Sequence, residues 1–298
     1  MFKKILVPLD GSVLGELSLP YAEELAGAFN SEVTLLFVCG TVNCQYRPEH
    51  QAYIEKTATL LKAHVKKEGV KITAKALVAE GHAAVKIIDY TAENDIRMIL
   101  MVTHGRSGIM SWAIGSTANK VLRGVNTPVL LIRANIPAPE ASVKGQLFNR
   151  ILVPLDGSEA GEAMLPYVKE LAKNLKAEVT LLQVVEPGQH VHTVGGLNYV
   201  PFHEQELENL KAHAREYLDG VSSQFADTDN IMKVELKSGD AASEIIKFAD
   251  ETNTRLVTMS THGHAGIGRW ELGSVARKVL HHGNTPLLLV RTPTARAK

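Results

Sequence analysis

The chain has 298 residues, 45% of them hydrophobic and 21% charged, which is sufficient for about two globular domains with ordinary cores. Its 32 basic and 32 acidic residues balance, which argues against a nucleic-acid partner held by a broad basic face. No apolar run approaches the roughly 20 residues of a membrane-spanning helix, and the segment from Met1 to Val7 does not fit a signal peptide. We therefore expect a cytoplasmic protein with no membrane partner.

Cysteine and histidine usage gives little support for a metal site. The two cysteines, Cys39 and Cys44, do not form a CxxC motif and are too few to hold a metal alone. We expect them to be reduced thiols. His190 and His192 resemble half of a metal site, but no cysteine or acidic partner stands at ligand spacing, so we expect no bound metal there.

The second half of the sequence repeats the first. Residues 4–12, KILVPLDGS, return as residues 150–158, RILVPLDGS, at an offset of 146 residues. Residues 126–128, Asn-Thr-Pro, return as 284–286 at an offset of 158, so the second half carries 12 extra residues. Residues 187–201 contain prolines and glycines and are predicted to hold this insertion as a loop.

Strands and helices are predicted to alternate along the first half. The expected strands are residues 5–9, 33–38, 72–78, 98–102 and 128–133, and the expected helices begin near residues 12, 49, 83 and 116. Pro20 interrupts the first helix, which either kinks there or begins there. This alternation predicts an α/β fold with a doubly wound parallel sheet in each half.

A segment with two prolines separates the halves and defines the predicted domains. The first domain is residues 1–134, the linker is residues 135–148, and the second domain is residues 149–292. Ligands of doubly wound sheets bind beyond the carboxyl ends of the strands, where the strand order reverses. With the order 3-2-1-4-5, Asp10 and the loop at Gly105 flank that point, and Asp156 and Gly263 repeat the arrangement.

A glycine-rich stretch follows the fourth strand of each half. Residues 101–116, MVTHGRSGIMSWAIGS, return as residues 259–274, MSTHGHAGIGRWELGS. Each is predicted to be a strand end, a loop and a helix start, with Ser116 or Ser274 as the N-cap. The free N–H groups and the positive end of the helix dipole make this arrangement an anion site. A plain turn between two elements is the alternative.

Several candidate residues have two open interpretations. Asp10 and Asp156 either serve only the turn, because Asp-Gly favours turns, or accept hydrogen bonds from a ligand. His104 and His262 either contact an anion or pack behind the loop. Walker, dinucleotide-binding and GxSxG motifs are all absent from the sequence.

Taken together, these motifs resemble the universal stress protein family in its tandem two-domain form. The resemblance covers nearly all of both halves and rests on ILVPLDGS, Thr-His-Gly, Gly-x9-Gly-Ser and Asn-Thr-Pro. It implies two five-stranded parallel sheets of the adenine-nucleotide alpha-hydrolase-like type. Nucleotide-binding members hold ATP or AMP with Gly-x2-Gly-x9-Gly-Ser/Thr, an aspartate after the first strand and a backbone contact at the end of the second. The implied binding residues are Asp10, Val38, Gly105, Gly115 and Ser116, and Asp156, Val184, Ser260, Gly263, Gly273 and Ser274.

The chain departs from this motif at its first glycine. Val102 occupies that position in the first half and Ser260 in the second. Valine adds a branched side chain where glycine would let backbone approach phosphate, whereas serine is smaller and offers a hydroxyl donor. The resemblance therefore implies tighter nucleotide binding in the second half.

The leading hypothesis is a stress-response protein that signals by binding ATP or AMP, with Mg²⁺ entering only with ATP and no cofactor required for folding. One alternative is a nucleotide-free interaction module. Another is a slow ATPase or self-phosphorylating protein using Ser116 or Ser274, although the sequence shows no carboxylate cluster for Mg²⁺ and no base beside either serine. We do not expect an enzyme, and the protein partner is unknown.

The last strands give an architectural prediction. Exposed strand edges favour pairing, and joining two domains in one chain raises their effective concentration. We expect Val129–Ile132 to pair with Leu287–Val290 in an intrachain pseudo-dimer. Further association into a homodimer is left open.

Overall fold

The computed structural model describes residues 1–40, 44–66, 69–70, 72–103, 114–134, 146–193, 196–226, 230–261 and 272–292. The chain divides into two compact units. The first comprises residues 1–148 with 284–291, and the second comprises residues 149–283 with 292–298. Among the described residues, no helix is both long enough and apolar enough to cross a membrane.

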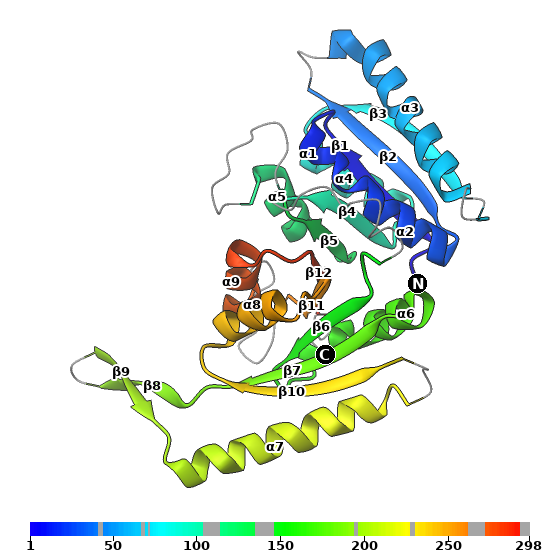
Figure 1. The fold of residues 1–298 in the computed structure, drawn as a ribbon. Coiled ribbons are helices and arrows are strands. Elements are labelled where there is room, and N and C mark those ends of the chain that lie inside the picture. The colour runs from blue at the N-terminus through cyan, green and yellow to red at the C-terminus, as the bar shows by residue number, and fades with distance from the viewer. Residues whose placement is uncertain are drawn as a thin grey trace, which may run out of the picture. The chain divides into compact units, whose positions relative to one another are not determined.

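The first unit contains the predicted parallel sheet (Figure 1). Its strands are β1 (Lys4–Leu9), β2 (Glu32–Cys39), β3 (Thr73–Glu80), β4 (Met98–Val102) and β5 (Val129–Ile132). Their order is β3-β2-β1-β4-β5, as predicted, and every neighbouring pair among them is parallel. β12 (Leu287–Val290) pairs antiparallel with β5, with Leu287 opposite Leu131. The predicted pairing of these two strands is confirmed, whereas the pseudo-dimer as a whole stays a prediction.

Helices connect the strands of the first unit. They are α1 (Val13–Glu16), α2 (Leu19–Phe29), the short 3₁₀ helix η1 (Cys44–Tyr46), α3 (Arg47–Lys66), α4 (Ala83–Glu93) and α5 (Ser116–Gly124). α2 packs with α3, and α4 packs with α5. Pro20 lies in the first turn of α2, where its missing N–H costs no intrahelical hydrogen bond, so the proline begins this helix and does not kink it.

The second unit repeats this plan. Its strands β6 (Arg150–Leu155), β7 (Glu178–Val185), β10 (Met232–Ser238) and β11 (Leu256–Ser260) lie in the order β10-β7-β6-β11. Its helices are the 3₁₀ helix η3 (Gly161–Met164), α6 (Leu165–Leu175), α7 (Glu204–Ser223), α8 (Ala241–Glu251) and α9 (Ser274–His282). The predicted α/β fold class is thus present in both units.

The insertion in the second half is not a loop. Residues Gly188–Thr193 form β8 and residues Gly196–Pro201 form β9, and the two strands pair antiparallel, with Gly188 opposite Pro201. Figure 1 shows this hairpin between β7 and α7. The loop prediction gave too much weight to the prolines and glycines. The intervening residues include β-branched and aromatic types such as Val191 and Tyr199, which favour strands.

Several strands are buried along their whole length. Every residue of β4, β5 and β11 is buried, as expected for parallel strands covered by helices on both faces. Because β1 and β4 run parallel, with Ile5 opposite Met98, their carboxyl ends meet at one edge of the sheet. β6 and β11 repeat this pairing, with Ile151 opposite Leu256. The residues that follow these strands therefore lie close together.

The two cysteines are joined, so the expectation of reduced thiols is wrong for this structure. Cys39 and Cys44 form a disulfide, and their Cα atoms are 5.3 Å apart. This separation lies within the usual range of about 4.4–6.8 Å for disulfides. Sequence spacing alone did not show that Cys44, at the start of η1, lies beside the last residue of β2.

Candidate functional site

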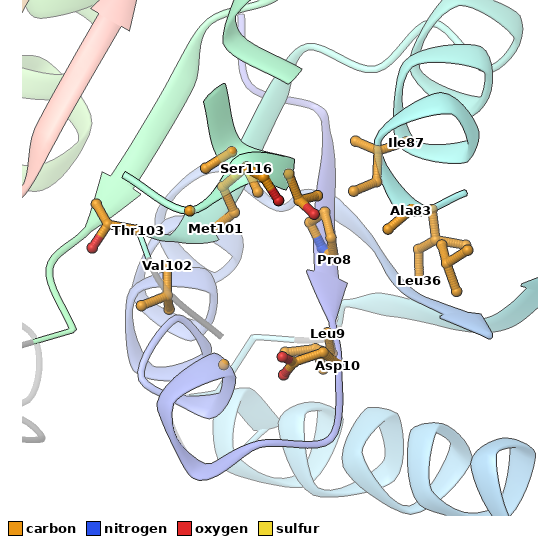
Figure 2. A pocket seen from close by; sticks show the side chains of 15 residues that line it. Pro8, Leu9, Asp10, Leu36, Ala83, Ile87, Met101, Val102, Thr103 and Ser116 are labelled. Carbon is orange, nitrogen blue, oxygen red and sulfur yellow. The ribbon is translucent and has the colours of Figure 1, made fainter. Parts of the chain in front are cut away.

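Each unit has a cleft at the carboxyl ends of its central strands. The first cleft lies beside the ends of β1 and β4 and has a volume of about 210 Å³ (Figure 2). The second lies beside the ends of β6 and β11 and has a volume of about 240 Å³. Both clefts occupy the point of strand-order reversal where doubly wound sheets bind ligands. Both volumes fall below the range of about 300–1,000 Å³ typical of small-molecule pockets, so we expect each cleft to enclose part of a ligand.

The two clefts match residue by residue. Pro8, Leu36 and Ile87 in the first correspond to Pro154, Leu182 and Ile245 in the second. All matched lining positions hold the same residue type except two. Val102 corresponds to Ser260, and Thr117 corresponds to Val275. The repeat has therefore kept the walls of both clefts nearly identical.

The predicted binding residues that the structure describes all line a cleft. They are Asp10, Val38, Gly115 and Ser116 in the first, and Asp156, Val184, Ser260, Gly273 and Ser274 in the second. Gly105 and Gly263 lie outside the described residues, as do His104 and His262. The structure thus brings the strand-end and helix-start parts of the prediction together.

The cleft aspartates are held by hydrogen bonds that recur in both units. Asp10 Oδ1 accepts from the backbone N–H of Ser12 at 3.0 Å and from its hydroxyl at 2.6 Å. Asp156 Oδ1 accepts from Ser158 at the same two distances. The turn interpretation is therefore correct for one oxygen of each carboxylate. Each aspartate also lines its cleft, so the hydrogen bonds that form the turn hold the same carboxylate that a ligand would meet.

A glycine makes room for each aspartate. Gly15 N donates to Ser12 Oγ at 3.0 Å, and Gly161 N donates to Ser158 Oγ at 2.9 Å. A Cβ added to Gly15 would lie 2.9 Å from Asp10 Oδ1, and one added to Gly161 would lie 2.5 Å from Asp156 Oδ1. Any side chain at these glycines would therefore push the carboxylate out of position.

A tyrosine–glutamate contact lies beside each aspartate. Tyr53 donates its hydroxyl hydrogen bond to Glu16 Oε1 at 2.9 Å, and Tyr217 donates to Glu162 Oε1 at 2.9 Å. Burial raises the pKa of each tyrosine, and the glutamate and nearby cleft aspartate raise it further. Both phenols therefore stay protonated and act as donors. Sequence analysis did not identify these residues, although Glu16 and Glu162 recur at the same offset as the DGS motif.

The helix starts differ slightly from the prediction. Gly115 and Gly273 are the N-caps, and Ser116 and Ser274 are the first helical residues, so the prediction that the serines cap their helices is wrong by one position. Gly115 N donates to Thr103 O and Gly273 N donates to Thr261 O, each at 2.8 Å. These bonds tie each glycine to the residue that follows the preceding strand, and each serine lies in the first turn of its helix. The positive end of the helix dipole still borders each cleft.

The rim of each cleft, which we define as the residue before the lining Ala83 or Ala241 together with the first turn of α4 or α8, differs in charge between the units. Asp240 caps α8, because its Oδ1 accepts hydrogen bonds from the backbone N–H and the hydroxyl of Ser243. Its Oδ2 forms an ion pair with Lys278 of α9 at 3.0 Å. The hydrogen bond from Ser243 and then the ion pair with Lys278 hold the pKa of Asp240 at about 2. The residue that precedes α4 in the first unit is His82, which makes no side-chain cap. In the next turn, Lys86 of α4 corresponds to Glu244 of α8.

Within the described parts of the chain, no three or more His, Cys, Asp or Glu side chains lie close enough together to hold a metal ion. The side chains of His190 and His192 are outside the described set. Each cleft combines apolar walls, a carboxylate and a helix N-terminus. Apolar walls suit a flat ring, a carboxylate suits a hydroxyl or amine, and a helix N-terminus suits an anion.

Comparison with known proteins agrees with this architecture. The pattern of the Universal stress protein family matches residues 1–133 and again residues 147–291. A universal stress protein of Methanocaldococcus jannaschii is 31% identical over 147 residues, which is 49% of this chain and 84% of the relative. One of Synechocystis is 24% identical over 317 residues, covering 97% of this chain and all of the relative.

Solved structures show the same fold over the whole length. The crystal structure of a universal stress protein from Archaeoglobus fulgidus aligns with a TM-score of 0.71 at 20% identity, covering 98% of this chain and 99% of that one. A second, from Pseudomonas aeruginosa, aligns with a TM-score of 0.67 at 17% identity over 97% of this chain and 93% of that one. The chain belongs to the universal stress protein family and carries two copies of its domain in tandem.

Proposed function

We propose that this stress-response protein binds an adenine nucleotide, ATP or AMP, in its clefts and signals by binding without turnover. The observation that carries the proposal is the pair of matched clefts, each of which places an oriented aspartate opposite a helix N-terminus. The apolar walls would hold the base, and the aspartate would accept a hydrogen bond from a ribose hydroxyl. The N–H groups at the helix start would bind a phosphate.

The second cleft is proposed to be the stronger site. Its wall carries the hydroxyl of Ser260 where the first cleft has the branched side chain of Val102. A hydroxyl can donate to a phosphate oxygen, whereas valine cannot. Mg²⁺ would enter only with ATP, held by the phosphates of the nucleotide.

Signalling is proposed to pass to an unidentified protein partner in the cytoplasm, with neither nucleic acid nor membrane involved. The balanced charge of the chain supports the absence of a nucleic-acid partner. The pairing of β5 with β12 supports an intrachain pseudo-dimer.

Isothermal titration with ATP, ADP and AMP tests the proposal directly. The wild-type chain is compared with Gly115→Trp, which fills the first cleft, and Gly273→Trp, which fills the second. We expect Gly273→Trp to weaken the affinity for nucleotide more than Gly115→Trp does, each compared with the wild type. No heat of binding with any nucleotide would favour the nucleotide-free interaction module.

Mass spectrometry after incubation with ATP tests for catalysis. We expect the mass of the chain to stay unchanged and free phosphate to stay at the level of the protein-free control. A gain of one phosphoryl group that disappears in Ser116→Ala or Ser274→Ala would instead show self-phosphorylation.

A further inference from the structure

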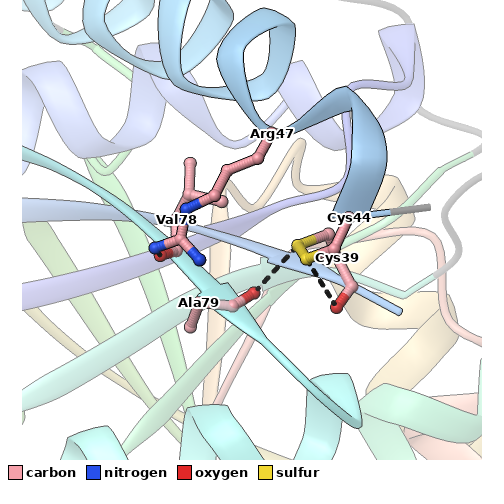
Figure 3. The surroundings of a disulfide bond; sticks show 5 residues. All are labelled: Cys39, Cys44, Arg47, Val78 and Ala79. Carbon is pink, nitrogen blue, oxygen red and sulfur yellow. Dashed lines mark hydrogen bonds between the residues drawn. A yellow bond between two sulfur atoms is a disulfide. The ribbon is translucent and has the colours of Figure 1, made fainter. Parts of the chain in front are cut away.

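The disulfide between Cys39 and Cys44 lies at the end of β2, next to a residue that lines the first cleft (Figure 3 shows the disulfide). Cys39 is the last residue of β2, and the preceding residue, Val38, lines the cleft. Cys44 is the first residue of η1, which leads into α3. Cys39 is only 2% exposed, whereas Cys44 is partly exposed. We therefore expect a small thiol in solution to attack at Cys44 and not at Cys39.

The surroundings of the sulfurs suit the reduced state as well as the oxidised one. Cys39 Sγ lies 3.5 Å from the carbonyl oxygen of Ala79, and Cys44 Sγ lies 3.9 Å from the carbonyl oxygen of Cys39 (Figure 3). In the disulfide these are sulfur–oxygen contacts, because neither sulfur carries a hydrogen. After reduction each thiol is a weak donor with a carbonyl acceptor already beside it. Reduction of the disulfide therefore leaves neither thiol without a hydrogen-bond acceptor.

The chain around Cys39 connects the disulfide to the cleft wall. The carbonyl oxygen of Cys39 accepts a hydrogen bond from Gly81 N at 2.9 Å. Gly81 precedes α4, whose residues Ala83 and Ile87 line the cleft. Arg47, three residues after Cys44, donates to the carbonyl oxygen of Val78 on β3 at 3.1 Å. The disulfide thus fixes the place where β2, β3 and the start of α4 meet.

We propose that Cys39 and Cys44 form a site of reversible thiol–disulfide exchange with small thiols such as glutathione, and that its redox state sets the ligand affinity of the first cleft. The second part rests on the proposed nucleotide binding. The first part stands without it.

The exchange is a balanced two-step reaction. A glutathione thiolate attacks Cys44 Sγ, which forms a mixed disulfide and releases Cys39 as a thiolate that takes up a proton. A second glutathione thiolate attacks the glutathione sulfur, which gives oxidised glutathione and releases Cys44 as a thiolate, protonated in turn. Two electrons pass from two glutathione molecules to the protein, and oxidised glutathione drives the reverse reaction.

The second unit provides an internal control. The residue matching Cys39 is Val185, whose carbonyl oxygen accepts from Gly239 N at 3.2 Å as Cys39 does from Gly81. Both cysteines of the chain lie in the first half. A thiol reagent should therefore act on the first cleft and leave the second unchanged.

Alkylation followed by mass spectrometry tests the exchange itself. The full-length chain is equilibrated in buffers of varied reduced-to-oxidised glutathione ratio and quenched with acid. It is then unfolded in urea and treated with iodoacetamide at mildly alkaline pH, so that the buried Cys39 reacts as well. We expect the two cysteines to move together from no added label to two labels across the series. A disulfide that persists in excess reduced glutathione, thiols that persist in oxidised glutathione, or a stable glutathione adduct on Cys44 would each overturn the proposal.

Titration with ATP tests the coupling to the cleft. Gly273→Trp confines binding to the first cleft, and its affinity is measured in the oxidised and reduced states. We expect a difference of about fivefold or more, the lower end of typical coupling between two sites. The double variant Cys39→Val with Cys44→Ser, which leaves no thiol in the chain, should give one affinity that glutathione does not change. In Gly115→Trp, which confines binding to the second cleft, the two states should agree.

The outcomes separate the two proposals. Equal affinities in the oxidised and reduced states would overturn the coupling. Failure of both clefts to bind any nucleotide would overturn the proposed function and the coupling with it, whereas the alkylation result would still decide the exchange reaction.

Discussion

The two clefts are close copies that differ where a ligand or a regulator would meet them. Both share the oriented aspartate, its serine and glycine partners and the tyrosine–glutamate contact. They differ at Val102 and Ser260 on the wall, at His82 and Asp240 on the rim, and at Cys39 and Val185 at the strand end. The shared contacts hold the turn after the first strand and the helix beside it, and each unit has both. The differences touch the inside or edge of a cleft, so affinity and regulation can diverge without change in the fold.

The largest expected difference comes from the wall residue. Ser260→Val removes a donor to a charged ligand, a loss of about 1.5–3 kcal/mol, or roughly tenfold to a hundredfold in affinity. Because Ser260 already has a partner within the protein, we expect the effect to lie near tenfold. Val102→Gly in the first cleft should strengthen binding there. Titration with ATP measures both changes, with Gly115→Trp or Gly273→Trp closing the opposite cleft.

This comparison can fail in two distinct ways. Equal affinities of the two wild-type clefts would show that the wall residue does not control binding. Absence of binding in a double variant, Val102→Gly with Ser260→Gly, would remove the nucleotide proposal altogether. Circular dichroism of each variant checks that the buried strands β4 and β11 remain folded.

The glycine beside each aspartate gives the next largest effect. Gly161→Ala places a Cβ 2.5 Å from Asp156 Oδ1, whereas Gly15→Ala places one 2.9 Å from Asp10 Oδ1. Overpacking of this kind typically destabilises a protein by about 1–3 kcal/mol. We expect both substitutions to lower the urea midpoint and Gly161→Ala to lower it more. Equal shifts of the two urea midpoints would contradict the prediction that the added Cβ is more crowded at Gly161 than at Gly15.

The fold was predictable because its signals are local and duplicated. Apolar runs such as Met98–Val102 identify strands, and the repeat confirms each assignment with a second copy. The hairpin Gly188–Pro201 was missed because it occurs once, in the insertion, where the glycines outweighed the strand-forming residues. The disulfide was missed because the spacing of Cys39 and Cys44 in the sequence does not show that their sulfurs lie together.

The candidate site was predictable only in part. Asp10 and Ser116 follow from strand ends and a helix start, so the topology brings them to one cleft. Tyr53 and Tyr217 could not be paired with Glu16 and Glu162 from the sequence. The tyrosines lie on α3 and α7, where the offset between the halves changes, so the repeat does not align them. Each contact joins helices that are not consecutive in the sequence, α3 with α1 and α7 with η3.

The smallest expected difference lies at the rim, where Asp240 caps α8 and pairs with Lys278. Asp240→Ala removes a helix cap, which typically costs about 1 kcal/mol, and should speed hydrogen exchange in residues 241–251 roughly fivefold. Asp240→Asn keeps the cap and loses only the exposed ion pair, so its effect should be smaller. In the first unit, His82→Asp should slow exchange in residues 83–93, because it supplies the missing cap and a partner for Lys120, the counterpart of Lys278.

The pH dependence of exchange tests the charge of Asp240. Its pKa of about 2 in the folded chain lies below the ordinary aspartate value of about 3.9, so the ionised carboxylate stabilises the folded state. This stabilisation is complete above about pH 4 and is lost as the pH falls toward 2. The ratio of exchange rates between Asp240→Asn and wild type should therefore exceed one at pH 6 and approach one near pH 2. A ratio that stays constant across this range would show that the charge of Asp240 contributes nothing to α8.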